Sequence, residues 1–268
     1  MTKRIGFIAL ALFIGITYSA CRKNDRDEDK ETTSCRDNAA AENAFAGIFK
    51  SIGEYADSSS FLRVGCASFT VDSIGTTSWP KTLTINFGSS NCMGADGNLR
   101  RGQIIASFTG RYRDSLTVIT ISTISYYHNN NLVQAGTHTI TNNGRNSSGN
   151  LSYSINVQNA SVTTTDGTVS WSSYRTREWI SGESTTTNPM DDVYSITGNA
   201  NGTGVNGNTF TVLINDPLIV ALNCAYIQQG KLTLTPANLS PRIIDFGSGA
   251  CDKDATVTIN DVVYEITM

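Results

Sequence analysis

The sequence predicts an all-β protein: an antiparallel meander that forms a curved sheet, a sandwich or a partial barrel, with one amphipathic helix at its N-terminal end. Short runs rich in β-branched and aromatic residues recur from residue 82 onward, separated by Gly, Asn and Asp. Asp166-Gly167, Asn206-Gly207 and Asn260-Asp261 lie between such runs and tolerate the positive φ of tight hairpins. The region lacks the recurring helices that parallel crossovers require, so the strands are expected to be antiparallel.

The chain opens with a basic start and a short apolar run. Lys3 and Arg4 precede sixteen mostly apolar residues, Ile5 to Ala20. At about 1.5 Å per residue, this run is too short to cross a hydrocarbon core of about 30 Å. Residues 1–20 are therefore predicted to be a signal peptide that is removed after export.

The end of this run resembles the lipobox of bacterial lipoproteins. Tyr18-Ser19-Ala20-Cys21 places two small residues before a cysteine, as in that motif, although Leu is usual where Tyr18 stands. The resemblance implies that Cys21 receives diacylglycerol and that the protein contacts a membrane through its acyl chains, which make attachment stable when two or more are present. Plain secretion is the alternative.

Residues 22–34, with the sequence RKNDRDEDKETTS, contain charges of both signs and no apolar side chain. Such a segment cannot bury enough surface to offset its ordering entropy, so residues 21–34 are predicted to be a lipidated tether. The acidic cluster Asp27-Glu28-Asp29 is similar to the signal that sends Bacteroidota lipoproteins to the outer face of the outer membrane. Basic residues interrupt the cluster, so two alternatives stay open: a periplasmic location, or a spacer that carries no sorting signal.

The charge balance of the chain argues against nucleic acid as a partner. Loss of Lys3 and Arg4 with the signal peptide reduces the 20 basic residues to 18, against 23 acidic residues. Nucleic acid is not expected to bind, because phosphate recognition needs a concentrated basic surface. Residues 35–268 are predicted to form a single β-rich domain, which is within the usual range for an all-β body.

The predicted helix is the first element of that domain. Asp37 or Asn38 can cap a segment that runs to about residue 56. Its apolar side chains recur at three- and four-residue spacings, at Ala41, Phe45, Ile48, Phe49 and Ile52. This single stripe predicts a helix that packs on a sheet. A helix lying on a membrane surface is disfavoured, because the polar face is not rich in Lys or Arg.

The helix is followed by the predicted strands. They cover residues 82–87, 103–112, 117–126, 151–157, 168–179, 192–197, 209–215, 231–235, 242–246 and 255–259. Gly, Asn, Asp and Ser fill the intervals between them, as expected for turns.

Two segments, about 66–112 and 224–268, share one order of features and indicate an internal repeat. Cys66-Ala67 leads through a strand ending Phe-Gly-Ser to Cys92, and Cys224-Ala225 leads through a strand with the same ending to Cys251. The cysteines of each pair are 26 and 27 positions apart. In an oxidising compartment these spacings predict the disulfides Cys66–Cys92 and Cys224–Cys251. Each loop gives roughly 3.5 kcal/mol of stabilisation in the chain-entropy model.

Cys35 is left over from these pairs. It is either free or an early partner that displaces one of them. A cysteine-rich metal site is the competing interpretation, but no two cysteines have the two- to four-residue spacing that zinc sites favour.

Enzyme signatures are mostly absent, so no catalytic residue, metal or cofactor is expected. The chain has no nucleophile elbow, metalloprotease helix motif or phosphate loop. His128 and His138 are its two imidazoles, and both are expected to lie on the surface of strands. The adjacent acids Asp191 and Asp192 indicate a loop rather than a pair of catalytic carboxylates.

Three segments are rich in arginine, at residues 99–102, 110–114 and 174–179, and the last two supply the residues of a possible ligand face. Arg111 and Arg113 flank Tyr112, while Arg175 and Arg177 precede Trp179, so each pair of arginines is expected to share one face of a strand. Guanidinium groups beside aromatic rings can bind an acidic or sugar ligand. The preferred interpretation is cross-strand pairing of these arginines with Asp114, Glu178 or Asp192, which serves only the sheet.

Asp72-Ser73-Ile74 and Asp114-Ser115-Leu116 resemble the three-residue acceptor for general protein O-glycosylation in Bacteroidota. This resemblance implies Ser73 and Ser115 as possible modified residues.

Together with the lipobox, the segments GRYRD, DDVYSITG and CDKDATVTINDVVYEIT look like uncharacterised lipoproteins of the Bacteroidota over most of the mature chain. The resemblance implies an outer-membrane location and no particular activity. We expect a non-enzymatic cell-envelope lipoprotein that acts as a binding or structural module, with a glycan or an envelope protein as partner. The alternative is a lipid or lipoprotein carrier, because one helix and a long meander are similar to the half-barrel of outer-membrane lipoprotein carriers. A hydrolase is a third possibility and would need converging acids.

Overall fold

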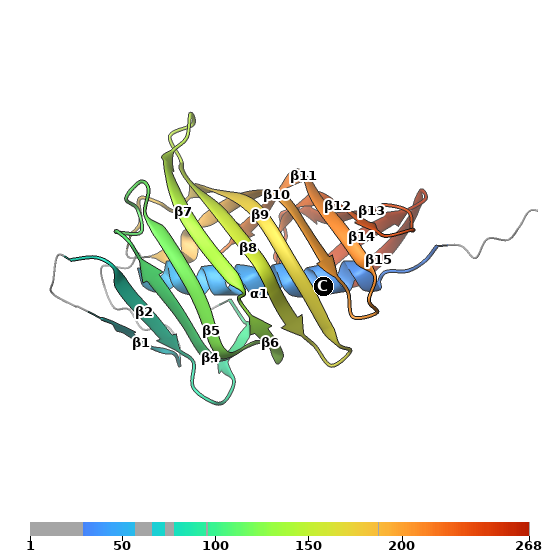
Figure 1. Ribbon diagram of the computed structural model, residues 1–268. Coiled ribbons are helices and arrows are strands. Elements are labelled where there is room, and N and C mark those ends of the chain that lie inside the picture. The colour runs from blue at the N-terminus through green and yellow to red at the C-terminus, as the bar shows by residue number, and fades with distance from the viewer. Residues whose placement is uncertain (1–28, 57–65, 73–77, 95, 187, 268) are drawn as a thin grey trace, which may run out of the picture.

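One α-helix, a short 3-10 helix (η1, Pro189–Asp191) and a single antiparallel sheet make up the described part of the chain, which in this computed structural model is residues 29–56, 66–72, 78–94, 96–186 and 188–267 (Figure 1). The helix, α1, spans Thr33–Ala56 and precedes the strands. The strands are β1 (Ser68–Val71), β2 (Lys81–Asn86), β3 (Cys92–Met93), β4 (Leu99–Phe108), β5 (Val118–His128), β6 (Asn131–Gln134), β7 (Thr137–Arg145), β8 (Leu151–Thr163), β9 (Thr168–Ser181), β10 (Val193–Thr203), β11 (Thr209–Ala221), β12 (Gln229–Pro236), β13 (Arg242–Ser248), β14 (Asp254–Ile259) and β15 (Val262–Thr267). The predicted antiparallel meander with one early helix is confirmed.

The order of strands in the sheet follows the order of the chain with few exceptions. β3 pairs only with β4, while β6 and β7 share the position between β5 and β8. Gly136 separates β6 from β7 with a φ of +61°, and a Cβ there would lie 2.2 Å from the carbonyl oxygen of Gln158. Only glycine fits this close approach, so β6 and β7 form one interrupted strand.

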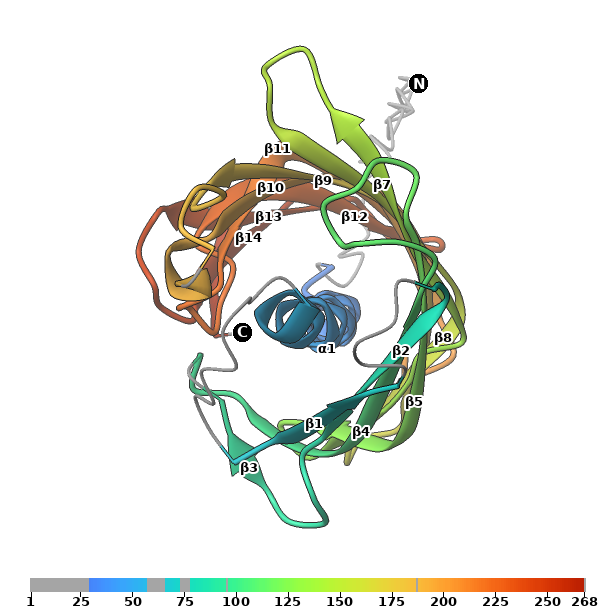
Figure 2. The ribbon, with the colours of Figure 1, turned by 90° about the vertical axis from the view of Figure 1, so that its left-hand side faces the viewer.

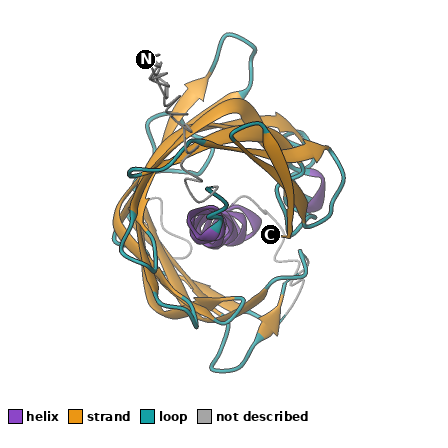
Figure 3. Cartoon of the chain, turned by 90° about the vertical axis from the view of Figure 1, so that its right-hand side faces the viewer, coloured by secondary structure: helices purple, strands orange, loops and turns teal. Residues whose placement is uncertain are grey.

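The sheet curves around α1, which lies along its inner side (Figures 2 and 3). Among the helix residues 33–53, only the side chain of Arg36 is exposed. The sequence predicted one apolar stripe packed on a sheet, and that stripe is buried. The structure differs in that the sheet faces the helix from several directions, with contacts to β2, β8, β9 and β12, so the polar faces of α1 are buried as well.

Alternation along each strand separates this interior from the outer surface, as the pleat requires. In β9 every second residue is buried, and the buried set is Val169, Trp171, Ser173, Arg175, Arg177 and Trp179. No helix in the described ranges has the length and apolar character needed to span a bilayer.

The start of α1 corrects the predicted cap. The helix begins at Thr33, and the Glu31 carboxylate accepts hydrogen bonds from the N–H and the hydroxyl of Ser34, both at 3.1 Å. Asp37 and Asn38 lie inside the helix and serve the sheet instead. Asp37 accepts from the Val205 N–H at 3.0 Å, and the Asn38 side-chain oxygen accepts from the indole N–H of Trp171 at 3.4 Å.

The boundary of the tether is also corrected. Arg242, which has no exposed surface, donates to the Asp29 carboxylate at 2.5 and 2.8 Å and to the Glu31 carbonyl at 3.1 Å. Residues 29–34 therefore belong to the folded domain, because a buried guanidinium needs acceptors that this segment provides. The signal peptide, Cys21 and the first part of the tether lie outside the described residues.

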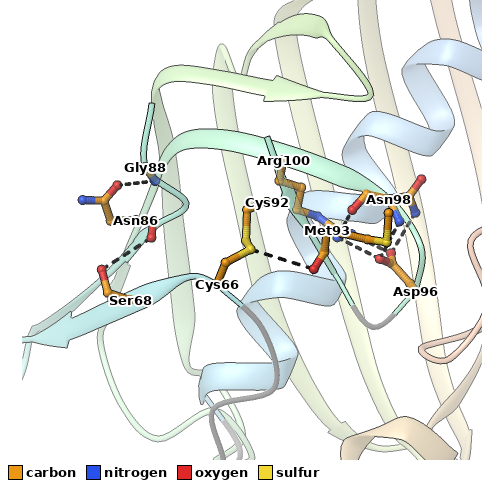
Figure 4. Close-up of a disulfide and its surroundings, with 9 residues drawn as sticks. All are labelled: Cys66, Ser68, Asn86, Gly88, Cys92, Met93, Asp96, Asn98 and Arg100. Atoms are coloured by element: carbon orange, nitrogen blue, oxygen red, sulfur yellow. Dashed lines mark hydrogen bonds and ion pairs between the residues drawn. A yellow bond between two sulfur atoms is a disulfide. The ribbon is translucent and has the colours of Figure 1, made fainter. Parts of the chain in front are cut away.

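Both predicted disulfides are present, with Cα–Cα distances of 5.6 Å for Cys66–Cys92 (Figure 4) and 5.8 Å for Cys224–Cys251. The two repeat units also share a turn. The Asn86 side chain accepts from the Gly88 N–H at 2.9 Å, and the Asp245 side chain accepts from the Gly247 N–H at 2.9 Å. In each unit one cysteine precedes a pair of strands and the other follows it, and these pairs are β1–β2 and β12–β13.

Two helical glycines give a matched test of the packing around α1. A Cβ on Gly47 would lie 2.7 Å from Cδ2 and Nε2 of the buried His128 ring, whereas a Cβ on Gly53 would have its nearest neighbours at 3.8 Å. Ala normally stabilises a helix interior over Gly by about 1 kcal/mol. We expect Gly53→Ala to raise the free energy of unfolding by up to about 1 kcal/mol and Gly47→Ala to lower it by about 1 to 3 kcal/mol through overpacking. Urea unfolding of both variants measures this, and equal stabilisation by both would contradict the enclosed position of α1.

Candidate functional site

Four buried arginines on the inner side of the sheet form the most unusual chemical feature of the molecule. Arg100, Arg175, Arg177 and Arg242 are 4%, 3%, 0% and 0% exposed. We call these four residues the arginine core. Arginine is rarely buried without partners, so each of these side chains requires an explanation.

Arg100 forms a two-point ion pair with Asp96, at 2.8 Å to one carboxylate oxygen and 2.6 Å to the other (Figure 4). Burial opposes ionisation of Asp96, but the hydrogen bonds and charge of Arg100 outweigh it and hold the pKa of this carboxyl well below its usual range. The Asn98 amide adds a hydrogen bond to the same carboxylate at 2.8 Å. This group is a closed unit whose charges cancel.

Arg175 connects β9 to the helix. Its Nη2 forms an ion pair with Glu42 of α1, and both side chains are largely buried. The guanidinium also lies 5.9 Å from the centre of the Trp171 ring. Removal of either charged partner is expected to be strongly destabilising, because the other charge would stay buried.

Arg177 lies within a set of aromatic rings. Its guanidinium carbon is 3.0 Å from the ring centre of Phe49, 4.6 Å from that of Tyr153 and 4.7 Å from that of Tyr194. Nη2 donates to the Tyr112 hydroxyl at 2.9 Å. Cation–π contacts of this kind are worth up to about 2 kcal/mol each when desolvated, so the rings stabilise the charge without neutralising it.

Other titratable groups are buried in the same interior. Lys50 is 6% exposed and donates to the Cys224 carbonyl, and burial lowers its pKa to about 8. His128 and His138, predicted to lie on the surface, are 3% and 2% exposed, and burial lowers the pKa of each to about 3. That prediction was wrong because strand periodicity does not tell which face turns inward.

The structure separates the residues of the possible ligand face. Arg111, Tyr112 and Arg113 follow the end of β4 and lie in a loop, with Arg111 exposed, Arg113 half-buried and Tyr112 buried. Arg175, Arg177 and Trp179 do share one face of β9, but this face is buried against α1. The loop that carries Arg113 contacts β9: the Arg113 guanidinium lies 4.6 Å from the Trp179 ring centre.

The predicted cross-strand acids have other positions. Arg175 pairs with Glu42 of the helix, whereas Glu178 accepts from the Asn150 amide at 2.7 Å. Asp192 is buried and accepts from the Tyr194 hydroxyl at 3.3 Å. The sequence did not indicate Glu42, Lys50, Arg100 or Arg242 as members of the interior.

The remaining predicted residues have simple surroundings. Cys35 is free and fully buried, and burial raises the pKa of its thiol to about 12. Ser115 is exposed in the loop before β5, and Ser73 lies outside the described residues. Across the described ranges, no three His, Cys, Asp or Glu side chains are grouped so that they could hold a metal ion.

A groove of about 600 Å³ crosses β8 to β12 and the turn after β12, and we call it the polar groove. Its hydroxyl and amide side chains are Asn159, Ser170, Ser172, Asn201, Thr203, Thr209, Thr211, Thr235 and Asn238. Ser172, Asn201, Thr211 and Thr235 are paired in register across four neighbouring strands. None of the described residues that line this groove has a charged side chain.

No protein-family model, curated protein or solved structure matches the chain.

Lys50 gives the interior a measurable pH dependence. Its pKa is lowered on folding, so the unfolded state holds one more proton between about pH 8 and pH 10.5. Stability therefore rises with pH across that window, and the destabilising contribution of Lys50 is full below pH 8. We expect the difference in free energy of unfolding between wild type and Lys50→Met to change by about 3 kcal/mol across the window. Urea unfolding at several pH values measures it, with the exposed Lys253→Met as control, and an unchanged difference would contradict burial of the charge.

Proposed function

We propose that the protein is a lipid-anchored, non-enzymatic module of the bacterial cell envelope that binds a partner on the outer face of its sheet. The observation that carries this proposal is the position of α1. Because the helix occupies the concave side of the sheet, the surfaces left for a partner of any size are those that face away from it.

The polar groove is the surface best suited to such a partner. Its volume of about 600 Å³ lies within the usual range of ligand sites. Its polar side chains are neutral hydroxyls and amides, which both donate and accept hydrogen bonds, and apolar residues such as Trp171 and Phe210 complete the lining. Sugar hydroxyl groups have the same double capacity, so a glycan matches this groove better than an acidic or basic ligand does.

The absence of an activity is part of the proposal, and the states of the imidazoles support it. A general base must reach its substrate and have a pKa near the working pH. His128 and His138 are buried, and the pKa of each is lowered to about 3. Asp191, which could pair with a second acid, accepts hydrogen bonds from the Thr185 hydroxyl at 2.8 and 2.9 Å on the surface.

A lipid or lipoprotein carrier is less well supported. A carrier needs an apolar cavity large enough for acyl chains, and the cavity between α1 and β9 measures only about 50 Å³. To open a larger one, α1 would have to leave the sheet and break its buried contacts with Arg175, Val205 and Trp171.

Membrane attachment is tested by substitution of the predicted lipidated residue. We expect Cys21→Ala, produced in a Bacteroidota host, to move from the membrane fraction to the soluble fraction after cell breakage. Cys35→Ala is the matched control and should stay with the membrane, because that cysteine is buried inside the domain. Complete retention of the Cys21→Ala protein in membranes would contradict the anchor.

Glycan recognition is tested by placing a charge in the groove. We expect the full chain in detergent to bind cell-envelope glycans on an array, and Thr211→Lys to bind them about tenfold more weakly or worse because it removes hydrogen bonds and adds an unmatched charge. Thr120→Lys, an exposed threonine of β5 outside the groove, is the control and should bind as wild type does.

Equal binding by wild type and Thr211→Lys would contradict this location of the site. No binding by any form, together with an unchanged envelope after deletion of the gene, would contradict the binding function itself.

A further inference from the structure

A straight row of polar side chains crosses the strands inside the polar groove. Asn201 of β10 lies opposite Ser172 of β9 on one side and Thr211 of β11 on the other. Thr211 in turn lies opposite Thr235 of β12. All four line the groove, and we call them the polar row. Neighbouring strands are about 4.8 Å apart, so the row presents one polar side chain at each interval of that length.

The side chains of the polar row are available to a ligand. Asn201, Thr211 and Thr235 are exposed, and within the described ranges their side chains have no hydrogen-bond partner. The Ser172 hydroxyl accepts from the Asn159 N–H at 3.1 Å, which leaves its proton free to be donated. Hydroxyl and amide groups both donate and accept, so the row matches a neutral ligand that carries hydroxyl groups at regular intervals.

An exposed aromatic ring lies beside one end of the polar row. Tyr174 is 52% exposed and shares the outer face of β9 with Ser172, about 7 Å further along the strand. Its side chain has no ring contact, cation–π contact or hydrogen bond with any described residue. The other strongly exposed aromatic side chain in the described ranges is Trp79, and it is covered, because the Lys81 ammonium lies 5.2 Å from its ring centre.

Two amide side chains flank Tyr174. Asn156 of β8 and Asn199 of β10 are paired with it across the sheet, and both are exposed. Side chains directly opposite each other lie about 5 Å apart at Cβ, so both amides reach a group that rests on the tyrosine ring. A sugar ring has C–H groups on its faces, which suit the negative face of an aromatic ring, and hydroxyl groups around its edge, which suit the amides.

We propose that Tyr174 stacks on one ring of a linear, neutral and extended glycan whose following rings lie along the polar row. This role of Tyr174 rests on the proposed glycan binding, and it assigns to the same site a ligand of defined shape. In a chain with β-1,4 linkages the rings follow one line at intervals close to the strand spacing. In a chain with α-1,4 linkages the rings wind into a helix, so few of them can contact a straight row.

Titration calorimetry of the full chain in detergent tests the shape of the ligand. The extended probes are β-1,4-linked hexamers of glucose, mannose and N-acetylglucosamine. The curled probe is the α-1,4-linked hexamer of glucose, which has the same composition as the first. We expect at least one extended hexamer to bind about tenfold more tightly than the curled one, because it makes more hydrogen bonds to the row. Its affinity should rise with chain length and level off at about the length of a row that crosses four strands.

Tyr174→Ala is the informative variant, because the exposed ring makes no contact that the fold needs. Its affinity for the extended hexamer should fall about three- to tenfold, the size of a lost aromatic contact. Tyr174→Phe keeps the ring and should retain most of the wild-type affinity. Ile180→Ala is the matched control, since it removes an exposed apolar side chain from the same face of β9 outside the groove. It should bind as wild type does.

Equal affinity in wild type and Tyr174→Ala would overturn the proposal, and so would equal affinity for the β-linked and α-linked glucose hexamers. Failure of all three extended hexamers to bind would overturn it as well. If the protein then still binds other glycans on an array, the shape of the ligand and the role of Tyr174 are refuted while the proposed function stands. If the array also shows no binding, the proposed glycan binding fails with them.

Discussion

Enclosure of a charged helix by one sheet is the constraint on which the rest of this structure depends. α1 brings Asp37, Glu42 and Lys50 into an interior without solvent, where each needs a partner. The partners lie in different elements: the Val205 N–H follows β10, Arg175 is in β9 and the Cys224 carbonyl follows β11. Contacts at three points along the helix allow only one depth and one rotation of α1 within the sheet. Apolar replacements of buried ion pairs are often no less stable, so such contacts are better explained as setting position than as supplying stability.

The two disulfides lie near the two ends of the meander. β1 and β15 each pair with a single neighbour, so the first and last strands have less support than those in the middle. The disulfide Cys66–Cys92 closes the unit that contains β1 and β2, and Cys224–Cys251 closes the unit that contains β12 and β13. Both stabilise the fold by limiting the freedom of the unfolded chain. Arg242 extends this support to the chain before α1, because it holds Asp29 and Glu31.

Patterns in the sequence predicted the elements better than their surroundings. β-branched runs and turn residues were sufficient for most strands and for both disulfides. The predicted strand ranges leave out β1, β3, β6, β7 and β15. β1 and β3 are only 4 and 2 residues long, and β6 and β7 are one strand broken at Gly136. A period of two showed that Arg175 and Arg177 share a face, but it does not say whether that face meets solvent or a helix. A usable signal was present in β13, where Arg242 lies two residues before Ile244 and four before Phe246, and all three are buried. Asp and Asn are favoured at helix caps, so the sequence alone placed Asp37 and Asn38 there. Their burial shows only in the structure, where they accept hydrogen bonds from Val205 and Trp171.

The resulting sheet has a few charged groups within its apolar core and neutral polar groups along its outer groove. β9 shows the division within four residues, because Ser172 faces the groove while Ser173 and Arg175 face the helix. A partner at the groove would meet no field from nearby charged side chains, so its association would depend on short-range hydrogen bonds and only weakly on salt. The pleat keeps the two chemistries apart, because a change of one residue along the strand transfers a side chain from one environment to the other.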